Sequence, residues 1–208
     1  MALPISQELK HHGFSHVTPW RRGVDVSLFA KGPKANLDLP RPLFLYVGRV
    51  AVEKNIDDFL KLDLPGSKVI VGDGPERQRL QQTYPTAHFL GALHGDALGA
   101  IYRSADCFVF PSRTDTYGLV MAEALAAGTP VACYPSSGAR EIFSSEHCGV
   151  MSEDLRGAAL RALQIPREMC KTVGQRHSLE ASADNFISIL RDVLITHAAS
   201  GSRWGRFA

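Results

Sequence analysis

The amino-acid sequence lacks the long apolar stretches that mark membrane proteins. Its 208 residues contain no uninterrupted run of eighteen apolar residues, the length at which a segment becomes a candidate membrane-spanning helix. Near the first residue there is no charged segment followed by an apolar one, the pattern of a secretory leader. We therefore expect a cytoplasmic location, at most with peripheral attachment to the inner membrane face through the basic tail around Trp204.

The sequence is also poor in cysteine, and no arrangement typical of thiol chemistry is present. Its four cysteines show no C-x-x-C spacing, a common signature of zinc sites and redox pairs. Two of them lie in the apolar segments "DCFVFP" and "VACYP", where strands are expected. We predict buried free thiols in a reducing compartment, not disulfides or metal ligands, at Cys107, Cys133, Cys148 and Cys170.

Several catalytic signatures and any strong charge bias are missing as well. The sequence contains no H-E-x-x-H, no G-x-S-x-G and no Walker-type loop, which argues against zinc proteases, α/β-hydrolases and P-loop kinases. The net charge is only +2, and the basic residues are dispersed apart from Arg21, Arg22 and the tail "SRWGRF". Nucleic acid is therefore not an expected partner.

What is present is an alternation of apolar and amphipathic segments. Several apolar segments show no period-two pattern, as is typical of strands covered on both faces. Repeated strand–helix units predict an α/β fold, a single Rossmann-like doubly wound parallel sheet with helices on both faces. The strands are expected at residues 43–50, 67–73, 87–91, 107–112, 130–135 and 148–152.

The length of the chain allows one well-cored domain or two small ones, and the sheet domain is expected to cover residues 41–195. Residues 1–40 are interpreted as an entry helix ("SQELKHHG"), a short strand ("HVTPW") and a connector. The final helix is expected near residues 178–197, followed by a flexible tail at 196–208.

Unusual residues gather where the predicted strands end. "VGR", "GDGP", "LGA" and "PSRTD" end the first four strong strands. In doubly wound sheets the ligand binds at the carboxyl ends of the strands, where the strand order reverses. The pattern therefore predicts a nucleotide-like ligand at this edge, with His94 of "LHGD" as the histidine expected nearest to it.

The segment "GRVAVEKN" brings two cations to the end of the first strand. Gly48 permits close approach of the backbone to a ligand, and Arg49 and Lys54 suit the separated anionic oxygens of a diphosphate. The alternative is a solvated loop in which Asn55 caps the next helix. The glycines of "GDGP", Gly72 and Gly74, fit either a simple connector or part of the cleft lining.

The segment "SRTDTYGLVMAEALAAGTPV" places Asp115 and Glu123 eight positions apart. A helix from about residue 116 would separate them by roughly 12 Å of axial rise, too far for a shared proton or metal. The free amides at its start, at Thr116, Tyr117, Gly118 and Leu119, would attract an anion, so both acids are expected to accept bonds from hydroxyls, Glu123 from a ribose. The alternative makes Asp115 a helix cap and Glu123 a structural anchor.

Several of these segments occur in one order that resembles the donor-binding domain of retaining GT-B glycosyltransferases, family 4. The resemblance extends to about Leu190 and implies that the chain is the C-terminal half of such an enzyme, without its acceptor domain. The matching segments are "GVDVSLF", "LYVGRVAVEKN", "VIVGDGPERQRL", "HFLGAL", "IYRSADCFVFPSRTDTYGLVMAEALAAGTPVA" and "SGAREIF".

The resemblance also implies roles for individual residues. Arg49 and Lys54 match the family's diphosphate-binding pair, and Asp115 and Glu123 match its E-x(7)-E acids, which contact the donor sugar and the ribose. Asp115 is one methylene shorter than the Glu that is usual in the family, so the sugar preference or the rate is expected to differ from that of the family. The backbone segments implied in donor binding are Tyr117, Gly118 and Leu119 beside the diphosphate and Phe89, Leu90 and Gly91 beside the base.

The implied reaction transfers a hexose from a nucleoside diphosphate sugar to a hydroxyl of an acceptor glycan or glycolipid, with retention. No cofactor is expected, and no metal, since the sequence has no D-x-D carboxylate cluster. Alone, the chain is expected to bind donor weakly and transfer slowly or not at all. The alternative is a non-catalytic nucleotide-sugar-binding module that acts with a separate acceptor-domain partner. A GT-B epimerase or phosphorylase fits less well, and the base stays open among GDP, UDP and ADP.

Overall fold

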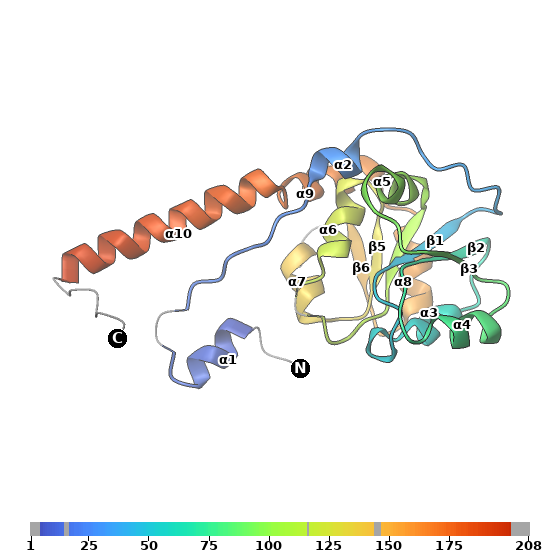
Figure 1. The fold of residues 1–208 in the computed structure, drawn as a ribbon, viewed down its shortest axis with the longest axis horizontal. Helices are drawn as coiled ribbons and strands as arrows, with labels where there is room; N and C mark the ends of the chain where they lie inside the picture. Colours follow the sequence, from blue (N-terminus) through green and yellow to red (C-terminus); the bar gives the residue numbers. More distant parts are fainter. Residues whose placement is uncertain (1–4, 15–16, 116, 144–146, 201–208) are drawn as a thin grey trace.

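The computed structural model describes residues 5–14, 17–115, 117–143 and 147–200. Its centre is a six-stranded parallel sheet with the strand order β3-β2-β1-β4-β5-β6 (Figure 1). All six strands lie within the segments predicted from the sequence, so the predicted doubly wound sheet is confirmed. The strands are β1 Leu43–Val47, β2 Ser67–Val71, β3 His88–Gly91, β4 Cys107–Phe110, β5 Val131–Cys133 and β6 Gly149–Met151.

Helices connect the strands and cover both faces of the sheet. Those of the sheet domain are the short 3-10 helix η1 Val52–Lys54 and the α-helices α3 Ile56–Leu60, α4 Arg77–Thr83, α5 Gly95–Ser104, α6 Leu119–Ala126, α7 Ser137–Phe143, α8 Leu155–Ala162 and α9 Arg167–Gln175. The flanking helices are α1 Ile5–His11, α2 Val26–Ala30 and α10 Leu179–Ser200.

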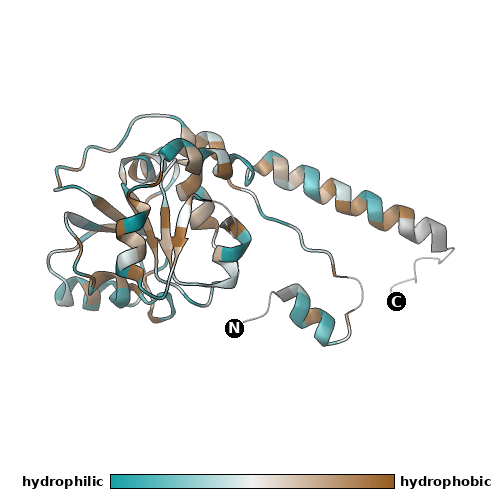
Figure 2. Ribbon diagram, turned by 180° about the vertical axis from the view of Figure 1, so that it is seen from behind, coloured by the Kyte–Doolittle hydropathy of each residue, from teal (hydrophilic) through white to brown (hydrophobic). Residues whose placement is uncertain are grey.

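The sheet separates two hydrophobic clusters, one on each face. Within β1, Leu45 and Val47 belong to the cluster under α2, α5, α6 and α9, while Phe44 and Tyr46 belong to the cluster under α3, α4 and α8. Neighbouring residues of one strand thus face opposite layers, and both layers are apolar. This explains why the strand segments show no alternation in sequence and are mostly brown in Figure 2.

The strand order reverses between β1 and β4, which are neighbours in the sheet although β2 and β3 lie between them in the chain. The connections after β1 and β4 therefore diverge to opposite sides and leave an opening between them. This is the place where doubly wound sheets bind their ligands.

The segment before α2 and the last helix lie against each other at one side of the domain. Trp20 donates from its indole nitrogen to the Ser182 carbonyl (3.1 Å), and its ring lies 5.2 Å from that of Phe186. The strand predicted over "HVTPW" is absent from described residues 17–20, where Pro19 has no N–H for a sheet. Val24, Val26 and Phe29 enter the core, while the boundary near residue 40 stays a prediction.

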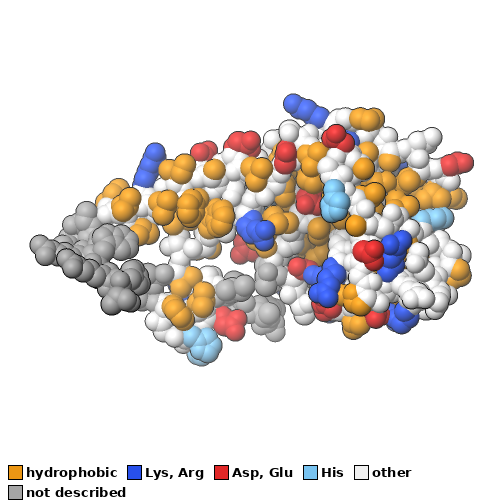
Figure 3. All heavy atoms as spheres, viewed as in Figure 1, with side chains coloured by type: hydrophobic (Ala, Val, Ile, Leu, Met, Phe, Trp, Pro, Cys, Tyr) orange, Lys and Arg blue, Asp and Glu red, His pale blue; other side chains and the backbone are white. Residues whose placement is uncertain are grey.

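Helix α10 extends away from the sheet (Figure 1) and starts one residue later than predicted. Its exposed hydrophobic side chains form much of the orange surface along the helix in Figure 3. Among the described helices, none combines the length and the apolarity that crossing a bilayer requires. The exposed apolar side chains of α10 are Leu179, Phe186, Ile187, Leu190, Val193, Leu194 and Ile195.

The four cysteines are all buried, and none of them forms a disulfide within the described residues, as the sequence predicts. Burial raises the pKa of the Cys170 thiol to about 12, so this thiol is protonated at neutral pH. The reducing compartment inferred from these residues stays a prediction.

Candidate functional site

A hollow of about 430 Å³ lies at the carboxyl ends of β1 and β4, beside the first turn of α6. Residues from four separate parts of the chain form its wall. Those predicted from the sequence are Gly48, Arg49, Lys54, Asp115, Tyr117, Gly118 and Leu119, and the others are Arg22, Tyr46, Val47, Glu53, Phe110 and Val120. The structure therefore brings the predicted cations, the first acid and the predicted backbone turn around one space.

The loop after β1 is fixed to the strand that precedes it. Tyr46 is buried, and its hydroxyl donates to the carbonyl oxygen of Arg49 (2.9 Å). The Arg49 guanidinium is exposed and lies 3.6 Å from the Glu53 carboxylate. The backbone of this loop is thus held in place, while the Arg49 side chain is free to turn towards an anion.

Lys54 and Asp115 form an ion pair across the hollow. The Lys54 Nζ lies 2.6 Å from Asp115 Oδ2, and the two side chains are 23% and 24% exposed. Lys54 was predicted to bind a diphosphate and Asp115 to bind sugar hydroxyls. In the structure, the two side chains bind each other instead. In the alternative interpretation Asn55 caps the next helix; it does occupy the N-cap position of α3, but its side chain forms no cap bond.

Helix α6 begins later than the sequence suggests. It starts at Leu119 behind Gly118, whose φ of 72° is left-handed and incompatible with a helix that continues from earlier residues. The estimate of helical rise between Asp115 and Glu123 is therefore wrong, and Asp115 is not the cap of α6. Among the described residues no side chain caps this helix, so its first amides remain available to an anion. Thr116 lies outside the described residues.

Glu123 does not line the hollow. It lies in the second turn of α6, and its Oε2 accepts a hydrogen bond from the Tyr102 hydroxyl (2.8 Å). Burial raises the pKa of Glu123 above its ordinary value, and the bond from Tyr102 acts in the opposite direction. The structure thus separates the two acids of the E-x(7)-E pair: Asp115 faces the hollow and Glu123 faces a buried phenol.

The turn after β2 packs directly beneath the loop after β1. Gly72 has φ of 135°, and a Cβ at this position would collide with the carbonyl oxygen of Gly48. The two backbones also bond, from Gly48 N to Val71 O (3.0 Å) and from Val50 N to Asp73 O (2.9 Å). Gly72 and Gly74 therefore support the loop that carries Arg49 and do not line the hollow.

The remaining predicted residues lie farther along the same edge of the sheet. Phe89, Leu90 and Gly91 are partly buried in β3, two strands from β1. His94 precedes α5 and makes no side-chain cap bond. Neither β3 nor His94 contributes to the wall of the hollow.

Arg22 is a wall residue that the sequence analysis did not identify. Its carbonyl oxygen accepts a hydrogen bond from the Tyr117 hydroxyl (2.7 Å), across 95 positions of sequence. This contact brings a third cation to the hollow, beside Arg49 and Lys54. The only sequence signal for Arg22 was its place in a pair of arginines before a glycine, and the neighbouring sequence does not indicate that Arg22 contacts Tyr117.

Comparison with known proteins identifies a family. The model of the family "Glycosyl transferases group 1" matches residues 30–162. A GDP-mannose-dependent alpha-mannosyltransferase of Mycobacterium tuberculosis is 38% identical over 155 residues, covering 70% of this chain and 40% of that protein. A protein of the same name from Mycolicibacterium smegmatis is 36% identical over 157 residues, covering 70% of this chain and 41% of its own length.

The fold gives a consistent result. The crystal structure of AviGT4, a glycosyltransferase involved in avilamycin A biosynthesis, superposes with a TM-score of 0.72 at 19% identity, over 92% of this chain and 62% of that one. The chain thus spans about two fifths of the length of the two mannosyltransferases, with 40% and 41% of each covered. With the family match extending over most of the sheet, the chain belongs to the group 1 glycosyltransferases and has their GT-B type of Rossmann-like fold.

Proposed function

We propose that this chain is the donor-binding domain of a retaining hexosyltransferase of family 4, and that its donor is GDP-mannose. The convergence of Arg49, Lys54, Asp115 and the uncapped start of α6 on one hollow is the observation that carries the proposal. The choice of GDP-mannose rests on the two relatives whose names include that donor.

In the proposed complex the diphosphate replaces the internal ion pair. Lys54 turns from Asp115 to a phosphate oxygen, so its positive charge remains neutralised. Asp115 is then free to accept hydrogen bonds from hydroxyls of the mannose. Arg49 and the first amides of α6 bind the remaining phosphate oxygens, and Arg22 adds a third positive charge.

The proposed chemistry follows from stabilising the leaving group. The bond from the anomeric carbon to the diphosphate breaks, and a bond to the acceptor oxygen forms on the same face, which retains the configuration. The acceptor proton passes to a diphosphate oxygen. Arg49, Lys54 and the α6 amides stabilise the developing negative charge, the task a metal ion has in other transferases. We therefore propose that the reaction needs no metal.

A second candidate is a nucleotide-sugar-binding module without activity of its own. It is favoured by the coverage, since the chain spans 40% of the first relative and catalysis needs both faces of a cleft. In either case we propose that the acceptor, a glycan or glycolipid, is bound chiefly by a further domain or a partner chain.

Calorimetric titration of the purified chain with GDP, UDP and ADP, and then with GDP-mannose, tests the donor. GDP and GDP-mannose are expected to bind more tightly than the other nucleotides. Equal affinity for all three nucleotides would refute the assignment of guanine as the base. If none of the nucleotides binds, the assignment of the hollow as a donor site would be refuted. Transfer to an acceptor by this chain alone would exclude the non-catalytic module.

A further inference from the structure

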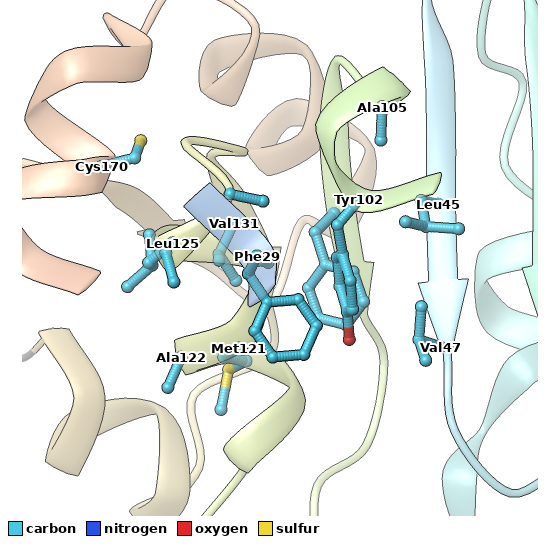
Figure 4. Close-up of a cluster of buried hydrophobic side chains, with 14 of the residues drawn as sticks. Phe29, Leu45, Val47, Tyr102, Ala105, Met121, Ala122, Leu125, Val131 and Cys170 are labelled. Carbon is cyan, nitrogen blue, oxygen red and sulfur yellow. The ribbon is translucent and has the colours of Figure 1, made fainter. Parts of the chain in front are cut away.

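Tyr102 is a fully buried tyrosine whose position is fixed from several sides. Its ring lies edge-on to Phe29 (5.5 Å between centroids) and tilted against Phe108 (5.7 Å). Its backbone carbonyl accepts a bond from Thr129 Oγ1 (2.6 Å). Figure 4 shows the phenol oxygen pointing in the direction in which β1 runs from Leu45 to Val47, towards the edge that carries the hollow.

That oxygen meets Glu123, the acid that does not line the hollow. The Tyr102 hydroxyl donates to Glu123 Oε2 (2.8 Å), whereas Oε1 has no hydrogen-bond partner among the described residues. No ion pair involving Glu123 is formed within the described chain. Within the described residues, one oxygen of Glu123 is thus bound by a rigid donor and the other is without a partner.

A glutamate on a helix turns about several side-chain bonds, and without a fixed partner its carboxylate samples many positions. Burial also raises the pKa of Glu123, and the Tyr102 bond is the one cause that lowers it. The buried phenol thus restricts the orientation of the Glu123 carboxylate and favours its charged form. A hydrogen bond to a charged group contributes more to binding than one to a neutral group.

We propose that Tyr102 is a positioning residue that makes the domain selective for nucleotides with ribose hydroxyls. It holds Glu123 so that Oε1 accepts from those hydroxyls. This inference rests on the proposed function, a donor nucleotide bound at the hollow, and on the expectation from the sequence that Glu123 contacts the ribose.

The test compares GDP with 2′,3′-dideoxy-GDP, which differs only in the two hydroxyls. Calorimetry on the parent chain is expected to give about tenfold or greater preference for GDP, the scale of a hydrogen bond to a charged group. In Tyr102→Phe the preference is expected to fall below about threefold, with the affinity for the dideoxy form unchanged. A general loss of structure would weaken both nucleotides alike, so the ratio isolates the positioning role.

Tyr84→Phe is the matched control, because the Tyr84 hydroxyl also donates to a carboxylate, Asp57 Oδ1 (3.1 Å), outside the hollow. It is expected to keep the parent preference. Phe29→Leu keeps the Tyr102 hydroxyl but removes a ring that fixes it, so the preference is again expected to fall. This variant decides the question if Tyr102→Phe does not fold.

A parent preference retained in full by Tyr102→Phe, or by Phe29→Leu in its place, would overturn the positioning role and leave the ribose contact standing. A parent that binds both nucleotides equally would overturn the ribose contact and, with it, this inference.

Discussion

Replacement of Lys54 by alanine perturbs the pair of charges at the centre of the hollow. In the structure Lys54 Nζ lies 2.6 Å from Asp115 Oδ2, with both side chains about a quarter exposed (23% and 24%). In the proposed complex the same ammonium group binds a phosphate oxygen. The substitution therefore removes a contact from the free chain and a different one from the complex.

The expected loss of affinity is the difference between these two contacts. A hydrogen bond between charged groups is worth about 1.5–3 kcal/mol, and an exposed ion pair about 0.2–1 kcal/mol. Since the Lys54–Asp115 pair is partly buried, we place it near the upper figure, which leaves about 0.5–2 kcal/mol. Lys54→Ala is thus expected to weaken GDP binding by roughly 2- to 30-fold.

Calorimetry with GDP measures this loss, and Lys171→Ala is the matched control. Lys171 Nζ lies 2.7 Å from Glu168 Oε1 in a comparable ion pair outside the hollow, and its removal should leave GDP binding unchanged. The unfolding free energy is expected to fall by no more than about 1 kcal/mol in either variant. GDP affinity in Lys54→Ala equal to that of the parent would refute the assignment of this lysine to the diphosphate.

Three further predictions follow from individual groups. Arg22→Ala should weaken GDP binding about 2- to 5-fold, as an exposed contributor of charge, and unchanged affinity by titration would count against it. Asp115→Asn should not weaken GDP binding, because the Lys54–Asp115 pair no longer has to be broken, but it should weaken GDP-mannose relative to GDP about tenfold, whereas equal changes for both ligands would exclude a sugar contact. Burial lowers the pKa of His177 below 6.5, so on acidification the unfolded chain binds a proton at this residue before the folded chain does, and stability should fall as pH drops through 6.5. His177→Gln should therefore reduce the fall in melting temperature between pH 7 and 5.5. An unchanged dependence of melting temperature on pH would contradict this prediction.

The fold was predictable because its signals are local. A strand covered on both faces must be apolar at every position, and all six such segments contain a strand of the observed sheet. The strand order could not be read from those segments, although it decides where the hollow forms. The segment "HVTPW" was wrongly predicted as a strand because its apolar residues have another role. Trp20 packs on Phe186 of the last helix and does not belong to the sheet.

The site was predictable where one short segment holds several of its groups, as with Gly48, Arg49 and Lys54. It was not predictable where the contact depends on distant parts of the chain. Arg22 reaches the hollow through Tyr117, 95 positions away. Glu123 lies in the predicted helix, but its contact with Tyr102, 21 positions earlier in the chain, could not be read from the segment.

A crystal structure of the chain with GDP tests the central claim most directly. We expect the diphosphate in the hollow, with its oxygens within hydrogen-bond distance of Arg49, of Lys54 and of the first amides of α6, and with the Lys54–Asp115 pair broken. GDP bound elsewhere on the chain, with that pair intact, would contradict the account.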